Sequence, residues 1–258
     1  MAAHVQFAIL LREAGSPNAD AIRRAFRTFT HLTDADAIRL AANAQGILMR
    51  HLGVDEAKAL QRALFAEGVN SAVVNEDELR FLPASQLLQR IELQHDELII
   101  FDREGRTTPV PWQRISLVAA GAVPHVEIGN VPGSGAGSGW VATLGRWTQP
   151  PTESRSRLET KQHLILELIV DRGVGRYEVQ AHQFPFQHVL ERSGAALTEK
   201  FVWLVREMTR RAPQALLNRA AQDIRDGVTL VRGYPSQPAM LDEMLWLLWS
   251  RAHGSATK

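Results

Sequence analysis

The chain has 258 residues, of which 45% are hydrophobic and 22% are charged, and these shares are typical of a globular protein with a sizeable core. Its 29 basic and 28 acidic residues nearly cancel, which excludes a strong global field that would attract nucleic acid or an anionic membrane. Cysteine is absent, so disulfides, thiol nucleophiles and cysteine-based zinc sites are excluded as well.

The N-terminal part of the chain predicts a small unit of strands and helices. Residues 5–11 form a short apolar run that is typical of a strand. Apolar residues then recur at helical spacing in three segments, which we expect to be helices: 18–29, 33–41 and 54–67. Gly68 is a typical C-terminal stop, and residues 71–75 predict a second strand. The expected order is therefore strand, three helices, strand.

The middle of the chain predicts a β-rich region. Strands are expected over five segments: 87–93, 97–101, 109–118, 163–170 and 176–183. Trp112 lies on the third of them. Residues 129–139 contain five glycines and no charge, a composition typical of a flexible loop. We expect this loop to extend over residues 125–161.

The last part of the chain is predicted to be helical. Helices are expected over 197–211, 215–224 and 240–251. The first has an apolar face and ends before Pro213, which cannot continue a helix. That face is made of Phe201, Leu204, Val205 and Met208.

Three stretches in the N-terminal part carry a resemblance to a known family: FAILLREAG at 7–15, AIRRAFRTFTHLTDADAIRLA at 21–41 and VDEAKALQRALFAEGV at 54–69. In their apolar positions and in the glycine before the last strand, they resemble the C-terminal domain of the bacterial ribosomal stalk protein. The ClpS protease adaptor shares that fold. The resemblance implies a small α/β sandwich over residues 1–83. It also implies a protein-binding face on the first helix, made of Ile22, Arg23, Arg24, Phe26 and Arg27.

The chain departs from both branches of this family. It carries a large second domain in place of the tail and dimerisation segment of a stalk protein. Where the ClpS pocket begins with an Asn-Asp pair, this chain has Gly15, Ser16, Pro17 and Asn18. The resemblance therefore implies protein binding in general and not the reading of N-terminal residues.

The layout of the second domain resembles a pleckstrin-homology-like barrel, since five or more strands are followed by the amphipathic helix 197–211. This implies a β-rich domain over 84–211 and a helical extension over 212–258. The expected fold class is α+β: a small α/β sandwich followed by a β-barrel-like domain with C-terminal helices. Barrels of this kind bind lipids, peptides or proteins.

Two sets of side chains are candidates for contact with a partner, and each has an alternative reading. Arg23, Arg24 and Arg27 share one side of a helix, where they form either a cationic face that binds carboxylates or an ordinary solvated face. Trp140 and Trp147 follow the glycine-rich loop. They form either a partner contact or a lid that folds onto the barrel.

The sequence contains no pattern that is typical of a catalytic site. A phosphate-binding loop requires Lys and Ser or Thr after its last glycine, but Trp140 follows here. Ser134 and Ser138 lie in the predicted loop and not in a strained elbow. We expect no enzymatic activity and no cofactor.

Histidines near the end of the β-rich region are possible metal ligands. His182, His188 and Glu191 are close in sequence and have suitable side chains for zinc. Pro185 interrupts their spacing, and the neighbouring phenylalanines favour a core edge. We expect no metal site.

The start and the apolar runs of the chain predict its location. No positive charge precedes the apolar residues of segment 1–13, as a signal peptide would require. The most apolar run, 244–249, is far shorter than the ~20 residues of a membrane span. We therefore expect a cytoplasmic protein without a membrane span.

These expectations lead to two main hypotheses of function, besides a third in which the chain is an enzyme whose catalytic residues are too scattered to be recognised in the sequence. The first is a non-catalytic adaptor that binds another protein of unknown identity. The alternative is a ligand-binding barrel that holds a lipid or a small molecule, with residues 125–161 as its gate.

Overall fold

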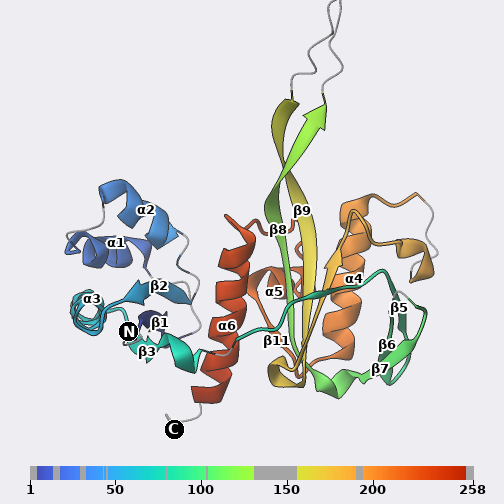
Figure 1. Ribbon diagram of the computed structural model, residues 1–258, viewed down its shortest axis with the longest axis horizontal. Coiled ribbons are helices and arrows are strands. Elements are labelled where there is room, and N and C mark those ends of the chain that lie inside the picture. Colours follow the sequence, from blue (N-terminus) through green and yellow to red (C-terminus); the bar gives the residue numbers. More distant parts are fainter. Residues whose placement is uncertain are drawn as a thin grey trace, which may run out of the picture.

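The computed structural model describes residues 5–13, 18–29, 33–42, 44, 46–79, 81–102, 104–130, 156–189 and 194–253. It contains both helices and strands, which confirms the expected α+β class. An N-terminal unit and a larger unit lie on either side of one long helix, α6 (Gln237–His253), and a two-stranded ribbon projects from the larger unit (Figure 1). Within the described ranges, no helix combines the length and the apolar character that a membrane span requires.

The N-terminal unit is a three-stranded antiparallel sheet with three helices, in the strand order β2-β1-β3. Its elements are β1 (Phe7–Leu11), α1 (Ala19–Arg27), α2 (Asp34–Ala42), β2 (Ile47–Leu52), α3 (Val54–Ala66) and β3 (Ser71–Asn75). The helices α1 and α3 contact each other, and α3 packs on β1 and β3. Their apolar faces meet in a core around Ile22, Phe26, Leu60 and Leu64, all of which are fully buried.

The strand β2 is an element that the sequence patterns did not reveal. It pairs with β1, and it buries Leu48 and Leu52. Arg50 and His51 interrupt its apolar pattern, and His51 has a φ of 59°, which is unusual for a residue other than glycine. The predicted order was therefore wrong. The observed order is strand, two helices, strand, helix, strand.

The larger unit contains two sheets. Its strands are β4 (Gln86–Leu87), β5 (Arg90–Leu93), β6 (Glu97–Phe101), β7 (Thr107–Pro111), β8 (Ile115–Asn130), β9 (Ser156–Val170), β10 (Gly175–Gln180) and β11 (Leu216–Leu217). They form a five-stranded sheet in the order β11-β8-β9-β10-β4 and a three-stranded sheet in the order β5-β6-β7. The described strands form open sheets, so the closed barrel over 84–211 stays a prediction.

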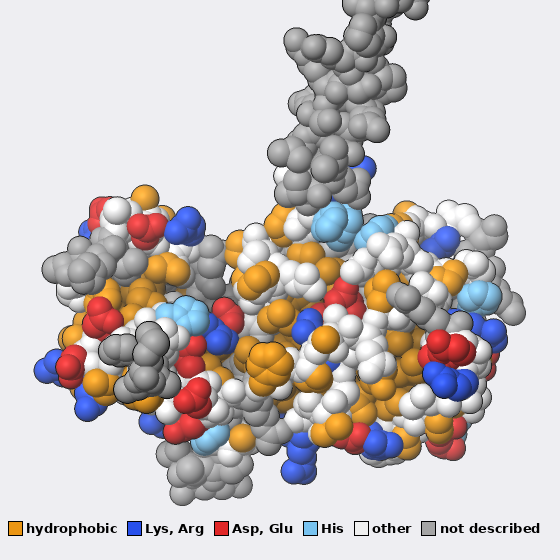
Figure 2. Space-filling model, in the orientation of Figure 1, with side chains coloured by type: hydrophobic (Ala, Val, Ile, Leu, Met, Phe, Trp, Pro, Cys, Tyr) orange, Lys and Arg blue, Asp and Glu red, His pale blue; other side chains and the backbone are white. Residues whose placement is uncertain are grey.

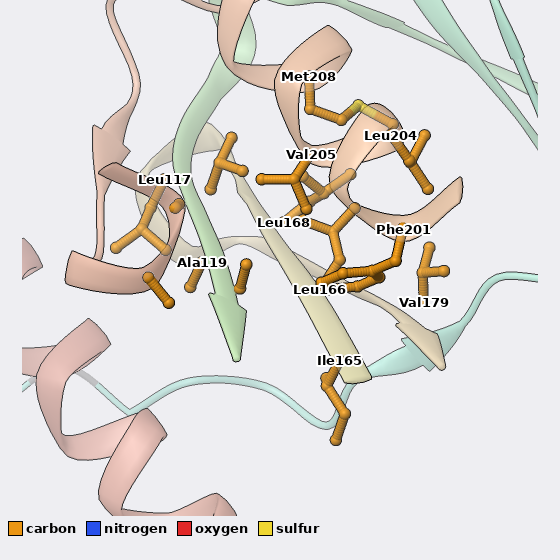
Figure 3. Close-up of a cluster of buried hydrophobic side chains, with 14 of the residues drawn as sticks. Leu117, Ala119, Ile165, Leu166, Leu168, Val179, Phe201, Leu204, Val205 and Met208 are labelled. Carbon is orange, nitrogen blue, oxygen red and sulfur yellow. The ribbon is translucent and has the colours of Figure 1, made fainter. Parts of the chain in front are cut away.

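The core of the larger unit forms where α4 (Leu197–Arg211) packs on β8 and β9 (Figure 3). The apolar face that the sequence predicted for this helix is buried as expected. It meets the strand residues Leu117, Ala119, Leu166, Leu168 and Val179, each of which is fully buried. Each large side chain of this kind contributes roughly 1.5–3 kcal/mol relative to an exposed position.

Three predictions for the β-rich region were wrong. Residues 87–93 do not form one strand, because β4 and β5 lie in different sheets. Residues 125–130 and 156–161 belong to β8 and β9 and not to a loop, because the two strands pair over their whole length. Residues 131–155, with most of the glycine-rich segment, lie outside the described residues. Trp112 lies in the 3₁₀ turn η2 (Trp112–Arg114) and not on a strand. There its indole Nε1 donates a hydrogen bond to the Gln94 carbonyl oxygen at 3.2 Å.

The described part of 212–258 is not a separate extension, since it belongs to the two cores. β11 pairs with β8, and α5 (Arg219–Arg225) and α6 also contact β8. Met240 and Met244 of α6 lie in the core of the larger unit, whereas Trp246 lies in the core of the N-terminal unit. The Trp246 Nε1 donates to the Leu11 carbonyl oxygen at 2.7 Å. α6 therefore joins the two units.

Candidate functional site

The apolar residues of the predicted protein-binding face lie in the core. Ile22 and Phe26 are fully buried together with Ala21 and Ala25. The same helical spacing that suggested an apolar partner surface instead places these side chains inside the N-terminal unit. Ile22 and Phe26 are therefore not available to a partner.

Arg24 and Arg27 of the predicted face are exposed and Arg23 is half-buried, and each of the three is paired with a carboxylate. Arg23 lies 3.1 Å from Asp20. Arg24 Nε donates to Glu67 at 2.8 Å, and Arg27 forms a two-point pair with Asp34 at 2.7 and 2.8 Å. Each guanidinium of α1 therefore has a carboxylate partner within the protein, although Arg23 Nε is buried without a hydrogen bond to a described residue.

The two tryptophans of the predicted partner contact, Trp140 and Trp147, lie outside the described residues. The strands on either side of them are described. Residues 125–130 and 156–161 form the outer half of the β8–β9 ribbon, which we call the arm. Its register runs from the pair of His125 and Lys161 to the pair of Asn130 and Ser156.

The arm stands clear of the other described elements (Figure 1). Six residues of a strand span roughly 20 Å. Exposure changes where β9 enters the body: Thr160 and Gln162 are exposed, whereas Ile165 and Leu166 are buried. The arm is therefore the part of the described structure that reaches furthest from a core.

Histidine side chains gather where the arm leaves the body (Figure 2). The His125 and His163 rings stack with centroids 4.5 Å apart, and the His163 and His182 rings lie 4.0 Å apart. The possible metal combination of His182, His188 and Glu191 is not assembled among the described residues, since Glu191 lies outside them. In the described part, no group of three acidic or histidine side chains is arranged to hold a metal ion.

A crevice of about 790 Å³ lies between the two units. Its apolar lining comes from Leu79 and Leu82, which connect the units, and from Leu241 and Leu245 on α6. Phe81 at its edge is 93% exposed. The crevice is therefore an open, largely apolar surface at the junction.

The two arginines of the crevice are paired with acidic side chains. Arg50 lies 2.7 Å from Asp242, and Arg176 donates to both oxygens of Glu167 at 2.9 and 2.6 Å. Burial raises the pKa of Glu167 to about 7, and the hydrogen bonds from Arg176 oppose this rise. Burial also raises the pKa of Asp242, against the charge of Arg50. Both arginines therefore already have an acidic partner within the protein.

A buried polar network lies beneath α6. Asn218 Nδ2 donates to the Tyr234 hydroxyl at 2.8 Å, and that hydroxyl donates to Glu243. Asn218 also bonds both backbone groups of Ala120 on β8, at 2.9 and 2.8 Å. Burial and the Glu243 carboxylate hold the pKa of Tyr234 well above its usual range. Because every member is bonded within the protein, the network orients the C-terminal segment and presents no free group to a ligand.

Sequence reasoning missed the arm, the crevice and the buried network. The arm had one signal, the apolar alternation around Val126 and Ile128, but the flanking glycines and prolines favoured a loop. The crevice and the network join residues far apart in sequence and had no local signal. Comparison of the chain with models of protein families, with curated proteins and with solved structures gives no match in any of the three.

Proposed function

We propose that the chain is a non-catalytic, cytoplasmic adaptor that binds another protein and that the arm contacts this partner. The observation that carries the proposal is the continuation of β8 and β9 past the body of the molecule (Figure 1). The resemblance of residues 5–75 to the stalk and ClpS folds supports the same class of function, since both act by binding proteins.

The arm lacks the packing that stabilises the rest of its sheet (Figure 1). A two-stranded hairpin without further packing is marginally stable in water. Both of its edges present backbone N–H and C=O groups that another chain can pair with. A partner that packs on the arm or pairs with its edge would satisfy these groups.

The test removes the arm and keeps the sheet beneath it. Both backbone groups of Ala122 bond the C-terminal segment: the N–H donates to the Arg232 carbonyl oxygen, and the C=O accepts from the Tyr234 N–H. They therefore point away from β9. The next pair, Val123 with His163, is therefore the hydrogen-bonded pair that a two-residue turn can close. Replacement of residues 124–162 by Asn-Gly should leave the circular dichroism spectrum of the remaining fold intact.

The full chain and the shortened variant are then purified from the native host. The proposal expects a stoichiometric protein partner with the full chain and its loss with the shortened variant. Retention of the same partner by the folded variant would show that the arm is not the contact.

The crevice favours a second candidate function, the binding of a lipid or small apolar molecule. Its lining of Leu79, Leu82, Leu241 and Leu245 supports this alternative. Native mass spectrometry of the chain from its host should then show a bound mass that Leu245→Arg removes. A chain without added mass would exclude this alternative and leave the adaptor proposal untouched.

A further inference from the structure

Two arginines of the N-terminal unit lack the carboxylate partner that its other described arginines have. The arginines of α1, α2 and β2 each lie within 3.1 Å of an acidic oxygen. Arg12, directly after β1, and Arg62, on α3, form no ion pair with any residue that the structure describes. Arg62 Nε donates only to the Lys58 carbonyl oxygen of its own helix, at 3.3 Å. Their positive charges are therefore not compensated.

These two side chains line the same pocket, which has a volume of about 390 Å³. It lies where the end of β1, the last turns of α3 and the start of β3 meet. The lining residues are Arg12, Gln61, Arg62, Phe65, Asn70 and Ser71. These described lining residues include two arginines and no acidic side chain, and the nearby Glu13 carboxylate accepts from Asn70 Nδ2 at 3.5 Å.

Phe65 gives this pocket an exposed aromatic surface. α3 buries Ala57, Leu60 and Leu64, and the residue after Leu64 lies about 100° further around the helix. Phe65 is accordingly 77% exposed. A large apolar side chain between cationic groups is typical of a contact surface for another protein.

Ser71 adds a polar group that the protein itself does not satisfy. The residue is 6% exposed, and its Oγ is buried without a hydrogen-bond partner in the described structure. Its carbonyl oxygen already accepts from Gln61 Nε2 at 3.0 Å. A buried hydroxyl without a partner costs free energy, so a residue of the pocket wall carries an unsatisfied polar group.

We propose that this pocket binds a short acidic segment of a partner protein. A carboxylate of the segment pairs with Arg12 and Arg62, since guanidinium groups bind carboxylates in a two-point geometry. A neighbouring apolar side chain of the segment covers Phe65. β3 is an edge strand of its sheet among the described strands, so an extended segment that leaves the pocket can pair with it.

The inference rests on the proposed protein-binding function, but it concerns a different surface from the arm. The variant with residues 124–162 replaced should therefore bind an acidic peptide as the full chain does. This separates a failure of the pocket from a failure of the arm.

The test measures fluorescence anisotropy with labelled peptides whose termini are blocked. The probe is Asp-Phe-Asp-Leu-Asp, and the matched control is Asn-Phe-Asn-Leu-Asn, which keeps the apolar side chains and removes the charge. Binding of the Asp peptide should be about tenfold tighter or more than that of the Asn peptide. The double variant of Arg12→Gln and Arg62→Gln should lose this difference. Arg39→Gln, at an exposed position of α2, should keep the preference for the Asp peptide.

Phe65→Ala supplies a second variant that is safe for folding, because the side chain is exposed. It should weaken binding of both peptides and keep the preference for Asp. Equal binding of the two peptides, no binding of either, or full binding by the double arginine variant would overturn the proposal. Tighter binding of a single-stranded RNA oligonucleotide, with the same dependence on Arg12 and Arg62, would overturn the choice of a protein segment.

Discussion

The contact between Gly46 and Trp246 gives the sharpest prediction about how the two units are joined. Gly46 has a φ of +112°, and a Cβ placed on it would lie 2.4 Å from the Trp246 ring. The backbone of Leu11 lies in the same contact. Its N–H donates to the Gly46 carbonyl oxygen, and its C=O accepts from the Trp246 indole N–H, both at 2.7 Å. Gly46→Ala must therefore displace the ring that anchors α6 in the N-terminal core.

Two effects contribute to the expected loss of unfolding free energy, and Gly68→Ala measures one of them alone. An alanine at positive φ costs about 1–2 kcal/mol through its backbone alone. The steric overlap with a packed ring adds about 1–3 kcal/mol. Gly68 has a φ of +76°, and a Cβ placed on it would meet no atom within 4 Å, so Gly68→Ala should show the backbone cost only. Gly46→Ala should thus lower the free energy of unfolding by about 2–5 kcal/mol.

The assay is urea unfolding followed by far-ultraviolet circular dichroism and by tryptophan fluorescence. Trp246→Ala removes the ring atoms at 2.4 Å but keeps the Cβ of residue 246, which a Cβ on Gly46 would meet at 2.8 Å. In that background Gly46→Ala should therefore cost the backbone contribution of about 1–2 kcal/mol and only part of the steric overlap. A non-additivity of up to about 3 kcal/mol between the two substitutions is the expected signature. If Gly46→Ala destabilises the protein no more than Gly68→Ala, or if the effects of the substitutions at Gly46 and Trp246 are additive, the Trp246 ring is not displaced as expected.

Three further predictions test the charges and hydrogen bonds of the described residues. The pKa of folded Glu167 is raised to about 7, whereas an unperturbed glutamate has a pKa of 4.5. Between these two values the unfolded chain ionises this side chain more readily than the folded protein, so the stabilisation by the protonated form is lost as the pH rises. Glutamine does not ionise, so between pH 4.5 and 7 the free energy of unfolding of Glu167→Gln, measured by urea unfolding, should fall by about 2–3 kcal/mol less than that of the wild type. An equal fall in both proteins would contradict the raised pKa of Glu167. Tyr234→Phe should cost about 1–3 kcal/mol, because Asn218 and Glu243 lose their shared hydroxyl. Tyr177→Phe, whose hydroxyl has no hydrogen bond to a described residue, should cost under about 0.5 kcal/mol by the same measurement. Arg27→Ala should change stability by less than about 1 kcal/mol, since its pair with Asp34 is exposed, and a larger loss would show that the pair is structural.

Helices with a strong apolar period could be predicted from the sequence. The bounds of α4 agree with the prediction, since Phe201, Leu204, Val205 and Met208 repeat at helical spacing and Pro213 follows. Periodicity does not say what covers the apolar face. Ile22 and Phe26 had the right spacing for a surface that contacts another protein, but they contact the core of their own unit.

The parts that the sequence did not predict depend on contacts between distant residues. β2 was missed because Arg50 and His51 break its apolar run, although pairing with β1 forms the strand. The pairing of Arg24 with Glu67 had no local signal, because the two residues are 43 positions apart in the sequence. The arm was missed because pairing between β8 and β9 outweighs a local composition that favours a loop.

Site-specific cross-linking from the arm tests the central claim most directly. A photo-reactive amino acid at Thr160, which is exposed on the arm, is compared in the native host with one at Glu104, which is exposed in the turn between β6 and β7. The adaptor proposal predicts one dominant cross-linked protein from position 160 and none of that species from position 104. Equal labelling from both positions, or no cross-linked protein from position 160, would contradict the proposal that the arm binds a partner.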